Sequence, residues 1–327
     1  MNKRNSTTTP YDDVHRTLLN DCPSLIIPVV NEMFNKHHQK DERIVLLNNE
    51  LFLNRQNGEQ AERITDTNLM IGSVRYHLEC QSTIDGTIMY RLFEYDSQMA
   101  LQNSELKGNT LIVQFPNTAV LYLRHNQHTP NEMLIEIQAR GGSCIYSVPV
   151  MKVQNYSIEE IFEKNLLFLI PFYLFSYEQY FPEDETDEKK LANLTAVYEG
   201  IAEELDAKAN VGVIDEYTKL TIMDMSKKVL EHLAKKYSNI KKEVGAVMGG
   251  KILDYEAKDI LNAGKAVGRE EGIGIGREEG IGIGREEGIV AMIKMAKKHH
   301  VPEDEIIEQL MTDFDLSEDK AKEYLGK

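Results

Sequence analysis

Two β-prone segments joined by a tight turn bring acidic side chains together. The segments are residues 63–71 and 74–81, and Gly72-Ser73 separates them. A two-residue loop that begins with glycine predicts a β-hairpin, in which the numbers of paired residues sum to 145. Asp66 then lies opposite Glu79, with the two Cβ atoms about 5 Å apart, where like charges repel each other. Either the two acids meet there by accident, or a cation belongs between the two carboxylates.

Gln81 shares the face of Glu79, because side chains alternate along a strand. Mg²⁺ is usually held by one or two carboxylates together with phosphates and water. The amide of Gln81 can orient a water molecule or contact a phosphate, so the spacing indicates a divalent-metal site for phosphoryl chemistry. The alternative is an ordinary solvated hairpin face, on which acids and amides are common.

The other face of the second strand is mostly apolar, with Tyr76, Leu78 and Cys80. We therefore expect the polar residues to line an exposed groove above a buried sheet. His77 has the same face as Glu79, where it either borders the site or is an ordinary exposed histidine.

The elements before and after the hairpin are predicted from periodicity and turn signals. Residues 11–36 predict a helix that is interrupted near Pro23, and Glu32 is the lone acid on its largely apolar second part. Residues 43–54 predict a strand and a turn. Residues 87–104 predict an amphipathic helix, on whose polar stripe Arg91 could reach a phosphate or form an ion pair.

Four further apolar segments, 110–115, 118–124, 133–138 and 144–150, complete a predicted sheet of about five or six strands. Ser157 and Glu160 form a capping-box pattern, which predicts a helix that continues to about Phe181. Residues 11–181 are therefore predicted to form one α/β domain around this sheet.

The C-terminal part of the chain is predicted to be helical. A charged segment, 182–190, indicates a domain boundary, and residues 190–267 have a helical composition. Residues 268–291 contain the repeats GREEGIGI, GREEGIGI and GREEGIVA. Each glycine costs a helix about 1 kcal/mol relative to alanine, which favours a tether. The alternative is a helix whose isoleucines pair with a second chain. Residues 292–326 predict a small helical tail.

Charge and composition narrow the function classes. The net charge is −16, divided between −6 in residues 1–180 and −10 in residues 181–327. A general nucleic-acid binder usually has a basic surface, so this charge argues against a DNA-binding function. The longest apolar run, 166–175, is interrupted by Pro171 and is far shorter than the roughly 20 residues of a membrane span. Three scattered cysteines without CxxC spacing favour a reducing cytoplasm.

The order of these elements resembles the PD-(D/E)XK nuclease superfamily, and more narrowly the Rpn-type recombination-promoting nuclease / putative transposase families. The stretches that carry the resemblance are DDVHRTLLNDCPSLIIPVVNEMF, ERITDTNLMIGSVRYHLECQS, MYRLFEYDSQMA and VPVMKVQNYSIEEIFEKNLLFLIPFYLFSYE. The likeness covers about residues 11–180. It implies a restriction-endonuclease-like α/β core with a mixed central sheet, followed by an all-α region.

The resemblance also implies a Mg²⁺- or Mn²⁺-dependent DNA endonuclease associated with recombination or mobile elements. Asp66 and Glu79 would be metal ligands, and Glu32 matches an acid on the first core helix. Gln81 replaces the lysine of the motif, and Thr65 stands at the place of its proline.

Two alternatives remain open at this point. A second Glu-x-Gln, at Glu136 and Gln138, lacks an acid across a tight turn and is interpreted as a solvent face. The whole chain could instead be a non-catalytic interaction protein on a nuclease-like scaffold, whose acidic helical half binds a protein partner. In either case we expect self-association through residues 190–291.

Overall fold

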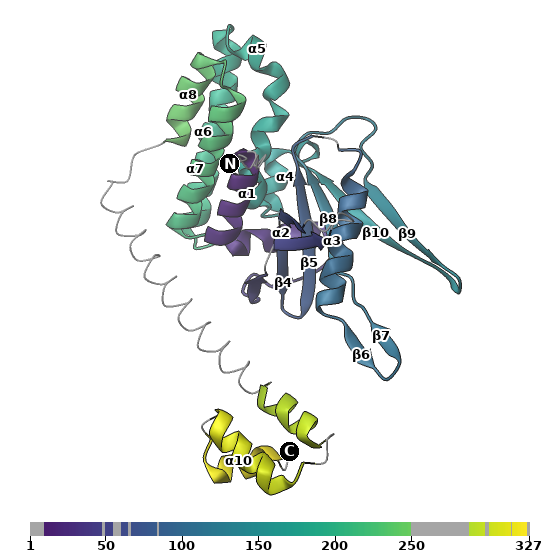
Figure 1. Cartoon of the computed structure of the whole chain (residues 1–327). Coiled ribbons are helices and arrows are strands. Elements are labelled where there is room, and N and C mark those ends of the chain that lie inside the picture. The colour runs from purple at the N-terminus through teal and green to yellow at the C-terminus, as the bar shows by residue number, and fades with distance from the viewer. Residues whose placement is uncertain are drawn as a thin grey trace, which may run out of the picture. The chain divides into compact units, whose positions relative to one another are not determined.

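The computed structural model describes residues 10–47, 50–54, 60–64, 67–83, 85–249, 288–297, 301–314 and 316–325 (Figure 1). The chain divides into two compact units, Met1–Gly250 and Lys251–Lys327.

A six-stranded mixed sheet forms the centre of the first unit, in the order β1-β4-β5-β8-β10-β9. Its central strands β5, β8 and β10 are parallel, and β1, β4 and β9 join them in antiparallel pairs. The strand bounds are Ile44–Leu46 (β1), Thr67–Ile71 (β4), Val74–Gln81 (β5), Asn117–Tyr122 (β8), Glu132–Ala139 (β9) and Gly142–Lys152 (β10). The predicted α/β class with a mixed sheet is therefore confirmed.

Two further strand pairs stand outside this sheet. They are β2 (Glu50–Asn54) with β3 (Gln60–Ile64), and β6 (Glu105–Lys107) with β7 (Thr110–Ile112). The prediction that residues 110–115 add a strand to the main sheet is wrong. The turn at Gly108, with φ +61°, instead folds β7 back onto β6, and every residue of both strands is exposed.

The hairpin of β4 and β5 has the predicted turn and register. Gly72 adopts φ +59°, a left-handed conformation that glycine reaches without a steric penalty. The pairs run from Ile71↔Val74 to Thr67↔Leu78, so paired numbers sum to 145 throughout the described strands. Asp66 lies outside the described residues, and its position opposite Glu79 stays a prediction.

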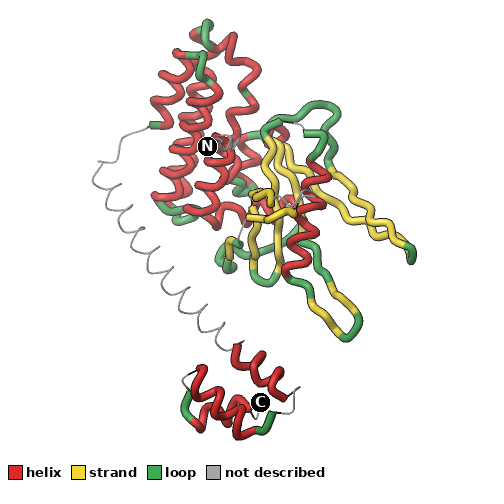
Figure 2. The backbone as a smooth tube through the Cα atoms, in the orientation of Figure 1, coloured by secondary structure: helices red, strands yellow, loops and turns green. Residues whose placement is uncertain are grey.

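The two faces of the sheet are covered by different helices. Helices α1 (Pro10–Asp21) and α2 (Ile26–Phe34) lie over the face of β5 that carries Tyr76, whose ring centroid is 5.2 Å from that of Phe34. Helix α3 (Ile88–Gln102) covers the other face, where its Leu92 packs with Tyr122 of β8. Figure 2 shows the pairs β6–β7 and β9–β10 extending away from this body.

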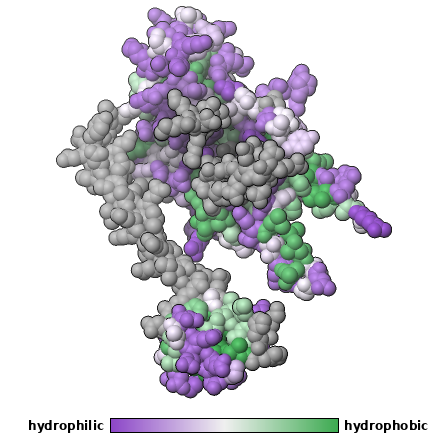
Figure 3. Space-filling view, viewed as in Figure 1, coloured by the Kyte–Doolittle hydropathy of each residue, from purple (hydrophilic) through white to green (hydrophobic). Residues whose placement is uncertain are grey.

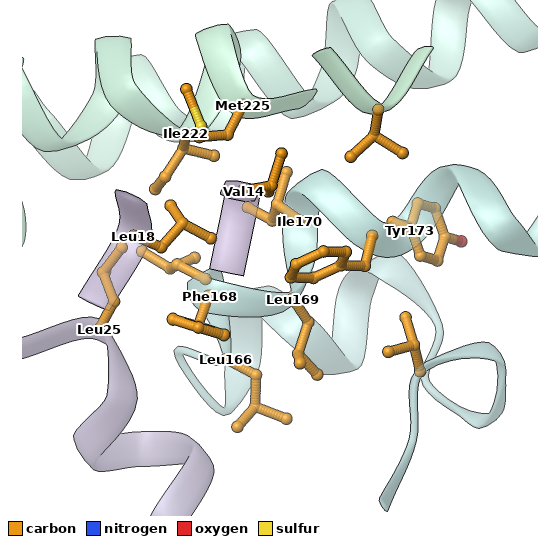
Figure 4. Packing of buried hydrophobic residues seen from close by; sticks show 14 of the residues in the cluster. Val14, Leu18, Leu25, Leu166, Phe168, Leu169, Ile170, Tyr173, Ile222 and Met225 are labelled. Atoms are coloured by element: carbon orange, nitrogen blue, oxygen red, sulfur yellow. The ribbon is translucent and has the colours of Figure 1, made fainter. Parts of the chain in front are cut away.

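Helices from the second half of the first unit share the core of the first half. Val14 and Leu18 of α1 pack with Ile222 and Met225 of α7 (Glu216–Leu233) and with Phe168 in a close-packed cluster (Figure 4). The charged segment 182–190 therefore lies inside this unit. The remaining helices of the unit are η1 (Pro23–Leu25), η2 (Val153–Asn155), α4 (Ile158–Glu163), η3 (Leu167–Ser176), η4 (Glu178–Tyr180), α5 (Phe181–Asp184), α6 (Glu188–Asn210), α7 (Glu216–Leu233) and α8 (Ser238–Met248).

The predicted capping box begins α4. The Ser157 side chain accepts a hydrogen bond from the Glu160 amide at 3.2 Å, and the Glu160 carboxylate accepts one from the Ser157 amide at 2.9 Å. The helix ends at Glu163, so the expectation that it continues to about Phe181 is wrong. Asn165 takes a left-handed φ of +55°, and the apolar segment after it forms the 3₁₀ helix η3, with Pro171 inside.

Replacing Ser157 with alanine should lower the free energy of unfolding by about 1 kcal/mol, because the change leaves the Glu160 amide without its cap. Urea unfolding followed by circular dichroism measures this. Ser147→Ala, at an exposed strand position, is the control and should change stability by less than about 0.5 kcal/mol. Equal stability of Ser157→Ala and the wild type would contradict the proposed role of the cap.

The second unit is helical in its described residues, as predicted. Residues 288–297 are helical, followed by α10 (Glu303–Phe314) and α11 (Glu318–Leu325). Its small core contains Ile289, Ile293, Ala296, Ile306, Leu310, Ala321 and Leu325. Residues 250–287, which include most of the predicted repeat segment, lie outside the described residues.

Among the helices of the described ranges, none combines the length and the apolar composition that a membrane crossing requires.

Candidate functional site

Glu79 lies on β5 on the face that α3 covers. Its exposed fraction is 4%, and that of His77 is 0%. The expectation of an exposed groove, and of an exposed histidine, is therefore wrong. The physical reason is that α3 packs Leu92 against this face of the sheet and brings the ring centroid of Tyr95 to 5.9 Å from that of His77. Gln81, at the end of the strand, is half-buried.

His77 lies between two buried carboxylates. Its Nδ1 is 2.7 Å from Oδ1 of Asp96 on α3, and its Nε2 is 3.3 Å from Oε1 of Glu79. Carboxylates only accept hydrogen bonds when they are ionised, so each ring nitrogen donates when both acids carry their charge. The arrangement therefore stabilises an imidazolium between two anions.

The pKa of His77 reflects this competition. Burial by itself disfavours the charged ring, but hydrogen bonds to Asp96 and Glu79, with the attraction of their charges, outweigh it and raise the pKa of His77 to about 9. At neutral pH the ring is thus a cation fixed inside the protein.

Asp96 is held by two further donors. Thr118 Oγ1 of β8 donates to its Oδ1 at 2.7 Å, and the Tyr146 hydroxyl of β10 donates to its Oδ2 at 3.3 Å. Burial, followed by the nearby charge of Asp96, raises the pKa of Tyr146, so its hydroxyl keeps the proton that it donates. The carboxylate of Asp96 therefore joins α3 to three strands of the sheet.

On its other side, Glu79 is linked to the surface. Gln81 Nε2 donates to Glu79 Oε2 at 3.3 Å, and Arg91 donates to Gln81 Oε1 at 3.1 Å. Arg91 also forms an ion pair with Asp85 at 3.3 Å. The predicted neighbours Glu79 and Gln81 are thus brought together, and Arg91 orients the amide of Gln81.

Glu32 is placed elsewhere. Its carboxylate binds Lys164 Nζ at 2.5 Å and the Tyr156 hydroxyl at 3.2 Å. Its helix α2 packs on the face of the sheet opposite to that of His77. These contacts give no support to a role for Glu32 beside Glu79, and that assignment stays a prediction.

The donor set of the described residues partly suits a divalent cation. Within the described ranges, no three His, Cys, Asp or Glu side chains are grouped as a metal site. Both ring nitrogens of His77 already face carboxylate oxygens, so the ring does not fit as a ligand. Glu79 does fit, because Mg²⁺ needs one or two carboxylates and completes its shell with phosphate and water. Asp66, the second predicted ligand, lies outside the described residues.

Lys152 is a buried lysine on a neighbouring strand at the level of Gln81, the residue that stands in place of the lysine of the nuclease motif. Gln81 pairs with Tyr122 of β8, and Tyr122 pairs with Lys152 of β10. The Lys152 ammonium, however, donates to the Thr129 carbonyl at 2.7 Å and to Asn131 at 2.8 Å. It fastens the segment before β9 and does not replace the lysine beside Glu79.

Sequence reasoning missed Asp96. One signal was present: Asp96 lies on the apolar stripe of α3, between Leu92 and Met99 at helical spacing. The second Glu-x-Gln behaves as predicted, since Glu136 and Gln138 on β9 are both exposed.

No protein-family model, no curated protein and no solved structure matches this chain.

Proposed function

We propose that the chain is a divalent-metal-dependent phosphodiesterase that cuts DNA internally, of the recombination or mobile-element type. The observation that supports this proposal best is the geometry of Glu79. Its carboxylate is held between the ring of His77 and the Gln81 amide, at the position of β5 that the sequence predicts to lie opposite Asp66.

In this proposal Asp66 and Glu79 hold Mg²⁺ or Mn²⁺. The bound ion supplies a Lewis acid for the phosphate and a water of lowered pKa. The Gln81 amide has no charge and cannot act as a base, but Arg91 fixes it, so it can orient the attacking water or contact the phosphate. Arg91 also places positive charge beside the site, although Asp85 offsets part of it.

The experiment is plasmid nicking with purified protein. Supercoiled plasmid with Mg²⁺ or Mn²⁺ should be converted to open circles, and EDTA should abolish the conversion because the water then loses its activating ion. Asp66→Ala should be inactive. A wild-type protein that leaves the plasmid supercoiled with either metal, or an Asp66→Ala protein as active as wild type, would refute the proposal.

The assembly state is a separate proposal. We propose self-association through residues 190–291, because isoleucines recur at fixed spacing in the repeats and can pair with a second chain. Light scattering from the full-length protein should give a mass at least twice that of one chain. A monomeric mass at micromolar concentration would contradict it.

The three free cysteines, of which Cys22 and Cys80 are buried, support the further proposal of a cytoplasmic location.

One observation favours the second candidate, an interaction protein without catalysis. Leu106 and Leu111, opposite each other in the β6–β7 pair, are 71% and 53% exposed, and Figure 3 shows apolar surface on this projecting hairpin. Exposed apolar surface of this kind often marks a protein contact. Calorimetric titration with Mn²⁺ separates the candidates: heat that is lost in Glu79→Ala supports the phosphodiesterase, and no heat from wild type supports the interaction protein.

A further inference from the structure

The polar network next to Glu79 is buried and hydrogen-bonded. His77, Asp96 and Thr118 have exposed fractions of 0%, 0% and 3%, and four elements (β5, α3, β8 and β10) contribute to it. Buried charges persist only where they are paired and hydrogen-bonded. The three donors to Asp96 meet this requirement and fix its carboxylate with little freedom to rotate.

The ring of His77 connects the fixed carboxylate of Asp96 to Glu79 and limits the orientation of the Glu79 carboxylate. With Nδ1 bound to Asp96 at 2.7 Å, the plane of the ring is set, and Nε2 then points at Oε1 of Glu79. Oε2 of Glu79 has a different neighbour, the half-buried Gln81. One oxygen thus faces the interior network, and the other faces the residue that leads to the surface.

We propose that His77 and Asp96 are positioning residues for the candidate site: they hold the carboxylate of Glu79 in the orientation in which it would bind the divalent cation, with Oε2 toward Gln81. This inference rests on the proposed phosphodiesterase. It goes beyond that proposal by adding two residues that touch neither metal nor substrate and act through Glu79. Partners that hydrogen-bond a metal ligand in this way are usually worth 10- to 100-fold in metal affinity or activity.

A purely structural role is the competing explanation, since the same network fastens α3 to the sheet. The two explanations differ in their effect on Glu79. A fastening role predicts lower stability but an unchanged site in any variant that folds. A positioning role predicts a weaker metal site in that folded variant.

The test compares His77→Gln and Asp96→Asn with Tyr146→Phe. The first two variants break the path from Asp96 to Glu79. The third removes one hydrogen bond to Asp96 and leaves the path intact, so it is the matched control for stability. Thermal unfolding confirms folding, calorimetry with Mn²⁺ alone gives the dissociation constant, and nicking kinetics give kcat and KM.

We expect the Mn²⁺ dissociation constant to rise about tenfold in His77→Gln and Asp96→Asn. We also expect kcat at saturating metal to fall about tenfold, with KM for DNA unchanged. Tyr146→Phe removes one of the three donors to Asp96 and keeps the contacts from Asp96 through His77 to Glu79, so both quantities should change less than in either of the other variants. Folded His77→Gln protein with wild-type affinity and kcat would overturn the inference while leaving the proposed function in place.

A measurement on wild type remains decisive if these variants do not fold. The signal of the His77 Nε2 proton in long-range ¹H–¹⁵N spectra should shift and saturate on titration with Mg²⁺, because the cation draws charge from Glu79. A signal that does not move would overturn the inference. If wild type neither binds metal nor nicks DNA, the proposed function fails, and the positioning role fails with it.

Discussion

Glu79→Gln should reduce metal-dependent nicking by at least about 1,000-fold, a loss of roughly 4 kcal/mol of transition-state stabilisation. Glutamine has nearly the same shape and can still accept the hydrogen bond from His77. The change therefore removes one negative charge and leaves the packing against α3 in place. Because a metal ion needs that charge to be held at neutral pH, the effect should appear in metal affinity and in rate.

The chain contains its own control for this variant. Glu136 and Gln138 repeat the Glu-x-Gln pattern on β9, where both side chains are exposed and Glu136 is paired with Ile145. Glu136→Gln should keep the nicking rate within about twofold, since surface changes away from a site rarely matter. Glu79→Gln protein that retains more than a tenth of the wild-type rate would show that this carboxylate does not carry the chemistry.

Stability must be measured alongside the rate. In Glu79→Gln the His77 cation keeps only Asp96 as a charged partner, and breaking a buried charge pair can destabilise a protein by several kcal/mol. Circular dichroism at the assay temperature shows whether the variant is folded. A folded but inactive variant separates loss of the site from loss of the structure.

Local rules were sufficient for the parts of the fold that depend on neighbouring residues. The Gly72 turn fixed the register of β4 and β5, periodicity identified α3 to within a residue or two, and Ser157 with Glu160 identified the start of α4. In each case the signal and the structure lie within a few residues of each other, so no tertiary information was needed.

Contacts between distant segments were not predictable in the same way. Alternation along β5 correctly separates the face of Tyr76 from that of Glu79, but it does not reveal what covers each face. The burial of Glu79 depends on α3 docking against it, and the links from Thr118 and Tyr146 to Asp96 depend on the order of strands in the sheet. The composition of the site was therefore partly foreseen, and its buried environment was not.

The predicted boundary at 182–190 failed for a related reason. Charged composition is typical of linkers, but the helix that follows has a buried stripe at Leu194, Tyr198, Ile201 and Leu205. This stripe, at helical spacing, joins the same core as the segments before the boundary. The apolar periodicity after the charged segment therefore predicts the extent of the domain better than the charged composition does.

His15 should make the protein sensitive to mild acid. The side chain lies in α1 with an exposed fraction of 2%, its ring centroid is 5.2 Å from that of Phe168, and its Nδ1 has no hydrogen-bond partner among the described residues. Burial, and then the nearby charge of Arg16, lowers the pKa of His15 to about 3. The folded protein therefore keeps this ring neutral over a range in which the unfolded chain binds a proton.

The sign of the effect follows from that difference. A histidine with a lowered pKa contributes stability that is present above its unfolded pKa of about 6.5 and is lost as the pH falls toward its folded pKa. Between pH 7 and pH 5 the loss amounts to about 2 kcal/mol. His15→Leu removes the titrating group and keeps a similar volume. Between pH 7 and pH 5 its free energy of unfolding should therefore fall by about 2 kcal/mol less than that of the wild type.

Urea unfolding at pH 7, 6 and 5, followed by circular dichroism, measures this difference. Comparing variant with wild type cancels the carboxylates and His77, because both proteins contain them. His128→Gln is the control for the replacement of a histidine that is not buried, since that ring is exposed. Equal losses of stability in His15→Leu and wild type between pH 7 and pH 5 would contradict the prediction. The ring of His15 would then accept its proton inside the folded protein, and the packing of α1 against η3 would have to open around it.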